Sequence, residues 1–173
     1  MSKQIRCAWG ESSLGAFLVA ASDRGLVALE FADQPASALA SLHHRFADTA
    51  IIEDSADLSP TVTTLTSLID HPGTAVDLPL DPRGSGPERR VWDALCAIPP
   101  GQTASYGEIA ARLGPPHDAR SVGEACAANT LALLIPCHRV VKKDGGLSGY
   151  RWGVRRKRAL LAREQSATAF ALA

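Results

Sequence analysis

The sequence lacks the features that mark membrane and secreted proteins. No apolar run in its 173 residues approaches the length that crosses a bilayer, and its first residues lack the apolar segment of a secretory signal. Hydrophobic residues make up 46% of the chain and charged residues 21%, the profile of a soluble globular protein. We therefore expect a cytosolic (cytoplasmic) protein with no membrane partner, folded as one large domain or two small ones.

Cysteine is scarce and has no metal-binding spacing. The four cysteines are Cys7, Cys96, Cys126 and Cys137, and none belongs to a C-x-x-C motif, so we expect neither a metal nor another cofactor. A reducing cytosol disfavours disulfides. Each cysteine is then a small buried hydrophobe or a reactive thiol, and we favour the first reading for all but Cys137.

Net charge is also absent, but the two halves of the chain differ in sign. Residues 1–88 carry 5 Lys and Arg against 12 Asp and Glu, a net of −7, whereas residues 89–173 carry 13 against 6, a net of +7. This asymmetry favours a polyanionic partner for the second half, although a basic run is often only a solvated face. The Pro- and Gly-rich residues 71–87 read as a linker, and we place the domains at 1–82 and 83–173.

The first domain is predicted to combine strands and helices. Two apolar runs around Ser22–Gly25 predict a β-hairpin within residues 15–31, and residues 5–9 predict a third strand. Ser59-Pro60 predicts the start of a helix, with Ser as N-cap and Pro in the first turn. An earlier helix is indicated by apolar residues at helical spacing, namely Ala38, Leu39, Leu42 and Phe46.

The second domain is predicted to be mostly helical. Ser105 and Glu108 form a capping box ahead of a short helix, and a second helix is expected over about residues 118–128. Two short helices across a tight turn indicate a helix-turn-helix, although many helix pairs bind nothing. A final helix is expected over residues 154–164, with basic residues 155–158 on its outer side.

Pro136-Cys137-His138-Arg139 is the segment most suggestive of chemistry. A cysteine beside a histidine suggests an activated thiol, because the thiolate is the nucleophile and a free thiol has a pKa of about 8.5. Neighbouring residues of an extended segment point to opposite sides, so direct contact between Cys137 and His138 is not assured. A water could bridge the two side chains instead. For this dipeptide alone, a structural cysteine is the simpler reading.

With its flanks, the motif resembles the O6-alkylguanine-DNA alkyltransferase (methylated-DNA–protein-cysteine methyltransferase) family, most closely the C-terminal half of the bacterial Ada group. The matching segments are residues 135–140, 119–122, 129, 148–153 and 164, with 80–81, 83–84 and 106. The resemblance implies an α+β fold. An N-terminal α/β domain would hold a small antiparallel, ribonuclease H-like sheet. A mostly helical C-terminal domain would carry a winged-helix-like helix-turn-helix, bind DNA and accept the alkyl group.

The same resemblance implies direct-reversal repair of double-stranded DNA. Cys137 would take an alkyl group, mainly methyl, once per molecule from O6 of a flipped-out guanine, and also from O4 of thymine. His138 would act as the base through a water, Glu164 would orient its ring, and Asn129 would brace the turn that bears Cys137. The Tyr106 hydroxyl would donate to guanine N3. A core tyrosine, a helix-capping asparagine and an exposed glutamate are the plainer alternatives for these residues.

Substrate and DNA contacts are also implied by the resemblance. The backbone N–H of Arg151 would meet O6, and Arg120 would enter the base stack in place of the flipped base. The expected substrate pocket comprises Tyr106, Val140, Tyr150, Arg151 and Trp152. The expected DNA-binding residues are Arg120, Ala119, Ser121, Gly123 and Arg139, with phosphate contacts from Arg89, Arg90, Arg112 and residues 155–158. Because Arg151 and Trp152 are bulky, we expect a narrow pocket that favours methyl over benzyl groups.

Two other functions stay open at this point. A protein that only binds and flags alkylated DNA would need no nucleophile, and the presence of Cys137 argues against it. A cysteine hydrolase would need an oxyanion hole and would leave the basic second half without a purpose. The clustered zinc-binding cysteines of the Ada N-terminal half are missing, so we expect no phosphotriester repair. We expect a monomer in a bacterial cytosol.

Overall fold

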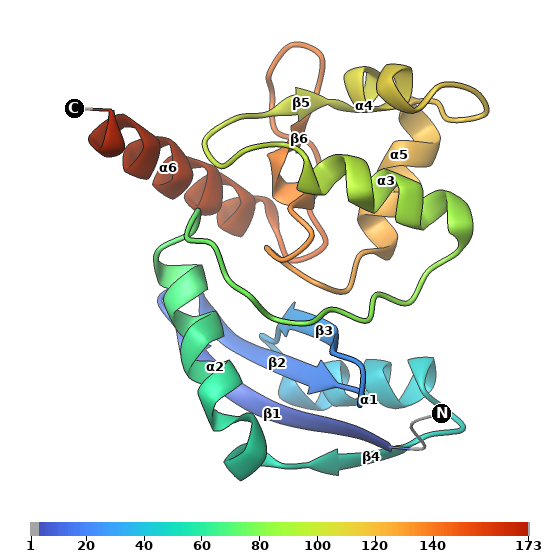
Figure 1. Cartoon of the computed structure of the whole chain (residues 1–173), viewed down its shortest axis with the longest axis vertical. Helices are drawn as coiled ribbons and strands as arrows, with labels where there is room; N and C mark the ends of the chain where they lie inside the picture. Colours follow the sequence, from blue (N-terminus) through green and yellow to red (C-terminus); the bar gives the residue numbers. More distant parts are fainter. Residues whose placement is uncertain (1–3, 173) are drawn as a thin grey trace. The chain divides into compact units, whose positions relative to one another are not determined.

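The computed structural model describes residues 4–172 and divides into two compact units. The N-terminal unit comprises residues 4–70 and 74–83, and the C-terminal unit comprises residues 71–73 and 84–172. Each unit has its own secondary structure, labelled in Figure 1. No helix among the described residues is long and apolar enough to cross a membrane.

A four-stranded sheet with the order β3-β2-β1-β4 forms the centre of the N-terminal unit. Its elements are β1 (Gln4–Ser12), β2 (Gly15–Ala21), β3 (Leu26–Phe31), α1 (Pro35–Arg45), β4 (Ala50–Glu53) and α2 (Ser55–Asp70). The predicted hairpin is β2 and β3, and the predicted third strand is β1. The sheet is mixed rather than wholly antiparallel, because β4 returns through the α1 crossover and pairs in parallel with β1.

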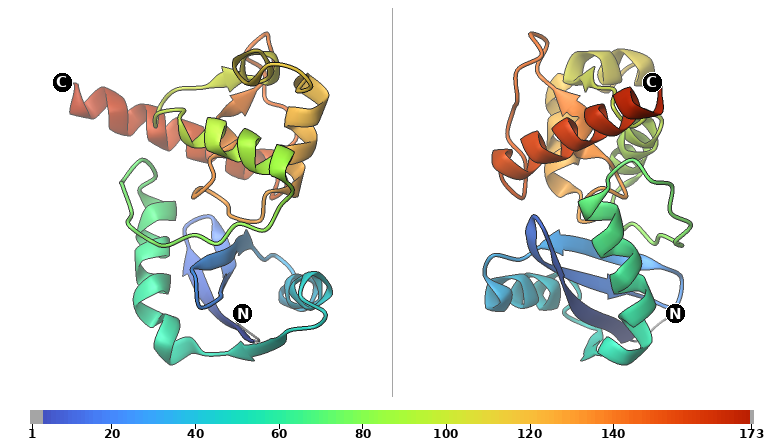
Figure 2. Two further views of the ribbon diagram at one scale, coloured as in Figure 1. Left: turned by 45° about the vertical axis from the view of Figure 1, so that its right-hand side comes forward. Right: turned by 90° about the vertical axis from the view of Figure 1, so that its left-hand side faces the viewer.

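The two helices of this unit lie on opposite faces of the sheet (Figure 2). Strand side chains alternate between the faces, and every residue of β3 is buried because both faces are covered. The core beneath α1 includes Ile5, Cys7, Leu18, Ala20, Val27, Ala28 and Leu42. Cys7 is therefore a small core residue, as expected.

Helix α2 corrects one prediction. It begins at Ser55 rather than at Ser59, and Pro60 lies inside it. Asp54 caps the helix, since its Oδ1 atom accepts a hydrogen bond from the Asp57 amide at 3.1 Å. The Ser-Pro pair was misread as the helix start because Asp54 supplies an alternative N-cap earlier in the chain. Leu65, Leu68 and Ile69, on the inner side of α2, are buried.

The C-terminal unit is mostly helical. Its elements are α3 (Gly86–Cys96), β5 (Ala104–Ser105), α4 (Tyr106–Leu113), α5 (Ala119–Ala128), the 3-10 helix η1 (Cys137–Arg139), β6 (Val140–Val141) and α6 (Val154–Ala171). The predicted capping box of Ser105 and Glu108 starts α4, and a second box of Asp118 and Ser121 starts α5. These two helices form the predicted helix-turn-helix.

A short parallel pairing of β5 with β6 positions the candidate site described below. Ala104 pairs with Val140 and Ser105 with Val141. The pairing places Tyr106, the first residue of α4, beside the segment that follows Cys137. Sequence-distant groups are thus held together by backbone hydrogen bonds rather than by flexible side chains.

Candidate active site

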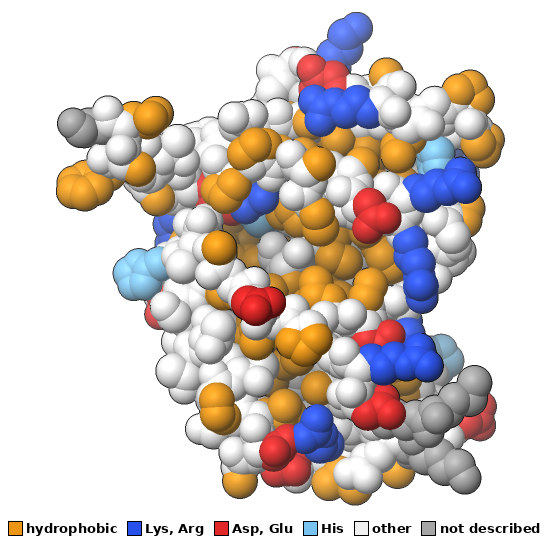
Figure 3. Space-filling view, viewed as in Figure 1, with side chains coloured by type: hydrophobic (Ala, Val, Ile, Leu, Met, Phe, Trp, Pro, Cys, Tyr) orange, Lys and Arg blue, Asp and Glu red, His pale blue; other side chains and the backbone are white. Residues whose placement is uncertain are grey.

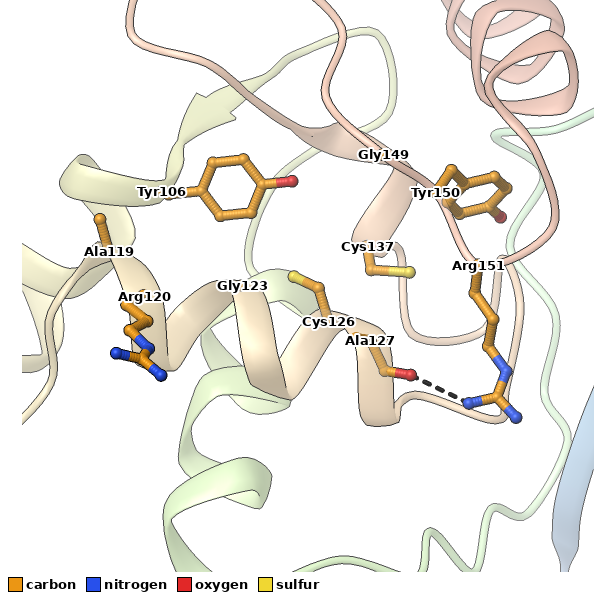
Figure 4. Close-up of a pocket in the computed structure, with 10 residues that line it drawn as sticks. All are labelled: Tyr106, Ala119, Arg120, Gly123, Cys126, Ala127, Cys137, Gly149, Tyr150 and Arg151. Atoms are coloured by element: carbon orange, nitrogen blue, oxygen red, sulfur yellow. Dashed lines mark hydrogen bonds between the residues drawn. The ribbon is translucent and has the colours of Figure 1, made fainter.

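Cys137 lies at the start of η1 and lines a cavity of about 630 Å³. The cavity wall is shown in Figure 4 and comprises Tyr106, Ala119, Arg120, Gly123, Cys126, Ala127, Cys137, Gly149, Tyr150 and Arg151. The cavity has the size of ordinary small-molecule sites. It joins a buried thiol, which is 4% exposed, to exposed residues of α5.

Asn129 holds the turn that leads to Cys137. Its side chain is fully buried, and its Nδ2 atom donates to the Ile135 carbonyl at 2.9 Å and to the Cys137 sulfur at 3.2 Å. Its Oδ1 atom accepts from the Leu131 amide at 2.9 Å. The turn needs this support because Leu133 has a φ of 62°, a left-handed conformation that is unfavourable for leucine.

Behind Cys137, the imidazole of His138 is fully buried against Glu164. Nε2 of His138 lies 2.8 Å from Oε1 of Glu164. Burial alone would raise the pKa of Glu164, but hydrogen bonds from His138 and Arg139 lower it to about 2. Because Glu164 is ionised, His138 donates from Nε2. Burial lowers the pKa of His138, so the ring is neutral at rest and its Nδ1 atom carries a lone pair that can accept a proton. Among the described residues, this buried atom has no hydrogen-bond partner.

The Cys137 thiol is protonated at rest. Burial raises its pKa, and the hydrogen bond from Asn129 and the positive charge of Lys157 offset this only in part. A thiol of this kind needs a base before it becomes a good nucleophile.

A second polar chain reaches the cavity through Tyr106. Its hydroxyl is hydrogen-bonded to the Ser148 hydroxyl, which accepts a hydrogen bond from Nζ of Lys157 at 3.1 Å. In Figure 4, the hydroxyl of Tyr106 points towards the Cys137 and Gly149 side of the cavity. Burial raises the pKa of Tyr106, and the bond to Ser148 opposes this shift.

The wall at the other end of α5 is formed around Arg151. Its Nη1 atom donates to the Ala127 carbonyl at 2.9 Å, drawn as the dashed line in Figure 4. The guanidinium also lies 5.8 Å from the ring centroid of Trp152, and Trp152 packs edge-on against Tyr150. Arg151 therefore links the residues before α6 to the C-terminal end of α5.

Comparison with known proteins accounts for both units of the chain. Residues 5–82 match the family model described as "6-O-methylguanine DNA methyltransferase, ribonuclease-like domain", and residues 87–166 match its "DNA binding domain". The inducible methylated-DNA–protein-cysteine methyltransferase of Bacillus subtilis is 35% identical over 88% of this chain and 86% of its own length. The chain belongs to the O6-methylguanine DNA methyltransferase family.

Other relatives support the assignment of this chain to the methyltransferase family. The bifunctional transcriptional activator/DNA repair enzyme Ada of Escherichia coli is 45% identical over 92% of this chain, which spans 45% of that relative's length. The structure of Mycobacterium tuberculosis OGT in complex with DNA superposes with a TM-score of 0.79 at 37% identity and covers 93% of both chains. The resemblance inferred from the motif and the α+β fold class are both confirmed.

In this methyltransferase-family chain, the structure brings most of the expected site residues together. Tyr106, Tyr150 and Arg151 line the cavity with Cys137, as do three residues of α5, Ala119, Arg120 and Gly123. Ser121 does not line the cavity and instead completes the capping box of α5 with the N-cap residue Asp118.

Four expectations are corrected. Arg139 does not face DNA, because it is buried and its guanidinium binds Glu164 and the Ile98 carbonyl. Lys157 is 1% exposed and is not on the outer side of α6. Val140 and Trp152 are buried and are not among the residues that line the cavity.

Several residues of the site were missed from the sequence. Cys126, Ala127 and Gly149 line the cavity, and none was assigned to it from the sequence, although Gly149 lies within the matching segment 148–153. Lys157 carried a detectable signal, because it precedes Leu160, Leu161 and Glu164 by three, four and seven residues, the spacing of one helix face. Within residues 4–172, no group of three metal-ligating side chains is found.

Proposed function

We propose that this chain repairs alkylated DNA by moving the alkyl group, mainly methyl, from O6 of guanine in a duplex to the sulfur of Cys137. One observation carries the proposal: a single cavity is lined both by a thiol, Cys137, and by the exposed face of α5, the second helix of the helix-turn-helix. A base extruded from a duplex on α5 would enter this cavity. We assign this chemistry to residues 83–173.

Activation of Cys137 uses the buried pair behind it. The thiol proton passes through one water to Nδ1 of His138, and the resulting imidazolium is stabilised by Glu164. The unpartnered Nδ1 atom and the 2.8 Å contact with Glu164 support this order of events. Asn129 fixes the sulfur in place by its hydrogen bond. Arg139 does not bind DNA in this scheme, and its guanidinium fixes the Glu164 carboxylate by hydrogen bonds.

Displacement follows in line. The sulfur attacks the alkyl carbon, the bond between this carbon and O6 breaks, and its electron pair passes to the guanine. Negative charge on the leaving base is met by two donors, the backbone N–H of Arg151 at O6 and the hydroxyl of Tyr106 at N3. The carbonyl of Cys137 accepts a hydrogen bond from the exocyclic amine. The thioether that forms on sulfur is stable, so each molecule acts once. Thymine alkylated at O4 offers an equivalent oxygen.

Binding of the duplex is assigned to α5 and to basic residues around it. Small residues Ala119 and Gly123 allow close approach of the helix, and the 86% exposed side chain of Arg120 would fill the gap left by the flipped base. Lys and Arg side chains lie along the α3 and α5 side of the C-terminal unit in Figure 3. Exposed candidates for phosphate contacts are Arg89, Arg90, Arg112, Arg155 and Arg158. We further propose that the protein acts as a cytosolic monomer.

The test is mass spectrometry after incubation with a duplex that carries O6-methylguanine. We expect one added methyl group per protein, located on Cys137 by peptide mapping, and restored guanine in the DNA. Cys137→Ser removes transfer and retains duplex binding, whereas Cys96→Ser, at the exposed cysteine, is the matched control with full transfer. Methylation of Cys126, or repair of many lesions per protein, contradicts the mechanism. Binding without loss of the lesion indicates a flagging protein instead.

A further inference from the structure

Lys157 is a buried cation, and no carboxylate within residues 4–172 forms an ion pair with it. Its side chain is 1% exposed, and its Nζ atom donates to the Ser148 hydroxyl at 3.1 Å and to the Gly149 carbonyl at 3.5 Å. Burying an ammonium is unfavourable unless its surroundings compensate. A lysine that only supported the fold would be replaced at lower cost by an apolar residue, so its position at the end of a polar chain calls for a function.

A chain of hydrogen bonds leads from Lys157 to the wall of the cavity. The Ser148 hydroxyl accepts from Lys157 and is also hydrogen-bonded to the Tyr106 hydroxyl. A hydroxyl is both a donor and an acceptor, so Ser148 can accept from the ammonium and donate to the phenol oxygen. The three groups come from α6, from the residues before it and from α4, and they meet only in the folded unit.

We propose that Lys157 and Ser148 form a proton relay that reprotonates the Tyr106 hydroxyl while the alkyl group leaves. The inference rests on the proposed function and deepens it. As the bond to O6 breaks, the Tyr106 proton moves to guanine N3, the Ser148 proton moves to the Tyr106 oxygen, and a Lys157 proton moves to Ser148. The leaving base ends neutral, and Lys157 ends as a neutral amine. With the Cys137 proton held by His138, the total charge of the site is unchanged.

The surroundings of Lys157 and Tyr106 favour proton transfer from Lys157 towards Tyr106. Burial raises the pKa of Tyr106, so its phenolate is unfavourable and must be neutralised at once. Burial lowers the pKa of Lys157, which makes the ammonium a readier donor, although negative charge on Cys137 would oppose that shift. Ser148 and Lys157 touch no reacting atom, and they are positioning residues that act through Tyr106.

The experiment compares single-turnover transfer from two duplexes. One carries O6-methylguanine, and the other carries O6-methyl-3-deazaguanine, in which a C–H group replaces the N3 acceptor. On the first duplex, Ser148→Ala and Lys157→Met should each lower the rate constant at saturating DNA by about tenfold or more, within the range of acid catalysis. The DNA concentration at half-saturation should stay within about twofold, because no binding contact is lost. Ser148→Thr, which keeps the hydroxyl, should restore most of the rate.

On the deaza duplex, the wild-type protein should be slow, and Ser148→Ala should cause no further loss. The double variant should be no slower than the slower single variant, as for two residues of one relay. Ser166→Ala, an exposed serine of α6, is the control for serine replacement, and melting curves show which variants fold. If Lys157→Met does not fold, the Ser148 variants decide. Equal losses on both duplexes, or a Ser148→Ala rate equal to wild type, would overturn the relay. A wild-type chain that transfers nothing overturns the proposed function itself.

Discussion

Asn129 and Cys137 are joined by a hydrogen bond in which the asparagine amide donates to the sulfur across 3.2 Å. The same amide also donates to the Ile135 carbonyl, and its oxygen accepts from the Leu131 amide. One buried side chain therefore ties both ends of a turn that contains Leu133 in a left-handed conformation. The position of the nucleophile and the stability of the turn depend on the same group.

Replacing Asn129 by Ala should destabilise the fold and disturb the thiol together. The substitution leaves the Leu131 amide buried without its partner and removes one of two bonds to the Ile135 carbonyl, to which the Cys137 amide still donates. We therefore expect a loss of about 1–3 kcal/mol in the free energy of unfolding. The pKa of Cys137 should rise, because a donor to its thiolate is lost. Urea unfolding and the pH dependence of thiol alkylation measure the two effects. An unchanged thiol pKa would show that the bond to sulfur has no electrostatic role.

Glu164 should make the stability of the protein depend on pH in the acid range. Its pKa is lowered from 4.5 to about 2 in the folded state, so the ionised carboxylate stabilises the fold above pH 4.5. This stabilisation is lost as the pH falls from 4.5 towards 2, because the native carboxylate must then be protonated. Glu164→Gln should flatten the dependence of the unfolding free energy on pH in that window. Glu124→Gln, at an exposed ion pair, should keep the wild-type slope.

Arg120 should matter for repair and not for folding. Its ion pair with Glu124 is exposed, so Arg120→Ala should change the unfolding free energy by less than about 0.5 kcal/mol. Extrusion of a base requires a few kcal/mol of unstacking, and without the Arg120 side chain in the stack we expect transfer from duplex DNA to slow by about tenfold or more. Transfer from the free O6-methylguanine base should be unaffected. Glu124→Ala is the control, and equal slowing on the free base contradicts the assigned role.

Arg151 should limit the size of the alkyl group. It lines the cavity and is hydrogen-bonded to the Ala127 carbonyl, whereas Trp152 is buried and does not line the cavity. Arg151→Ala should raise the rate for O6-benzylguanine relative to O6-methylguanine by about tenfold, the scale on which pocket contacts discriminate substrates. Arg151→Lys retains most of the bulk and should keep the wild-type ratio. Competition between the two substrates in one reaction measures this ratio directly, and an unchanged ratio for Arg151→Ala assigns the size limit elsewhere.

Much of the fold could be predicted because its signals are local. The turn at Ser22–Gly25 and the capping box of Ser105 and Glu108 act within a few residues, and both are found where the sequence predicts them. The start of α2 was misplaced because Ser59-Pro60 is a local capping signal, whereas Asp54 caps the helix earlier in the chain. The direction of β4 depends on pairing with β1, a distant segment.

The sequence by itself determined the family, the nucleophile Cys137 and the helices that flank it, because these are read from contiguous residues and their spacing. Only the tertiary structure decided which basic residues face solvent. Four consecutive basic residues at 155–158 must point around the whole circumference of α6, so at least one of them meets the core. Packing of Leu160, Leu161 and Glu164 turned Lys157 inward to Ser148, and the same packing buried Arg139 against Glu164. Burial of a charge is decided by its partners in space, which no run of residues specifies.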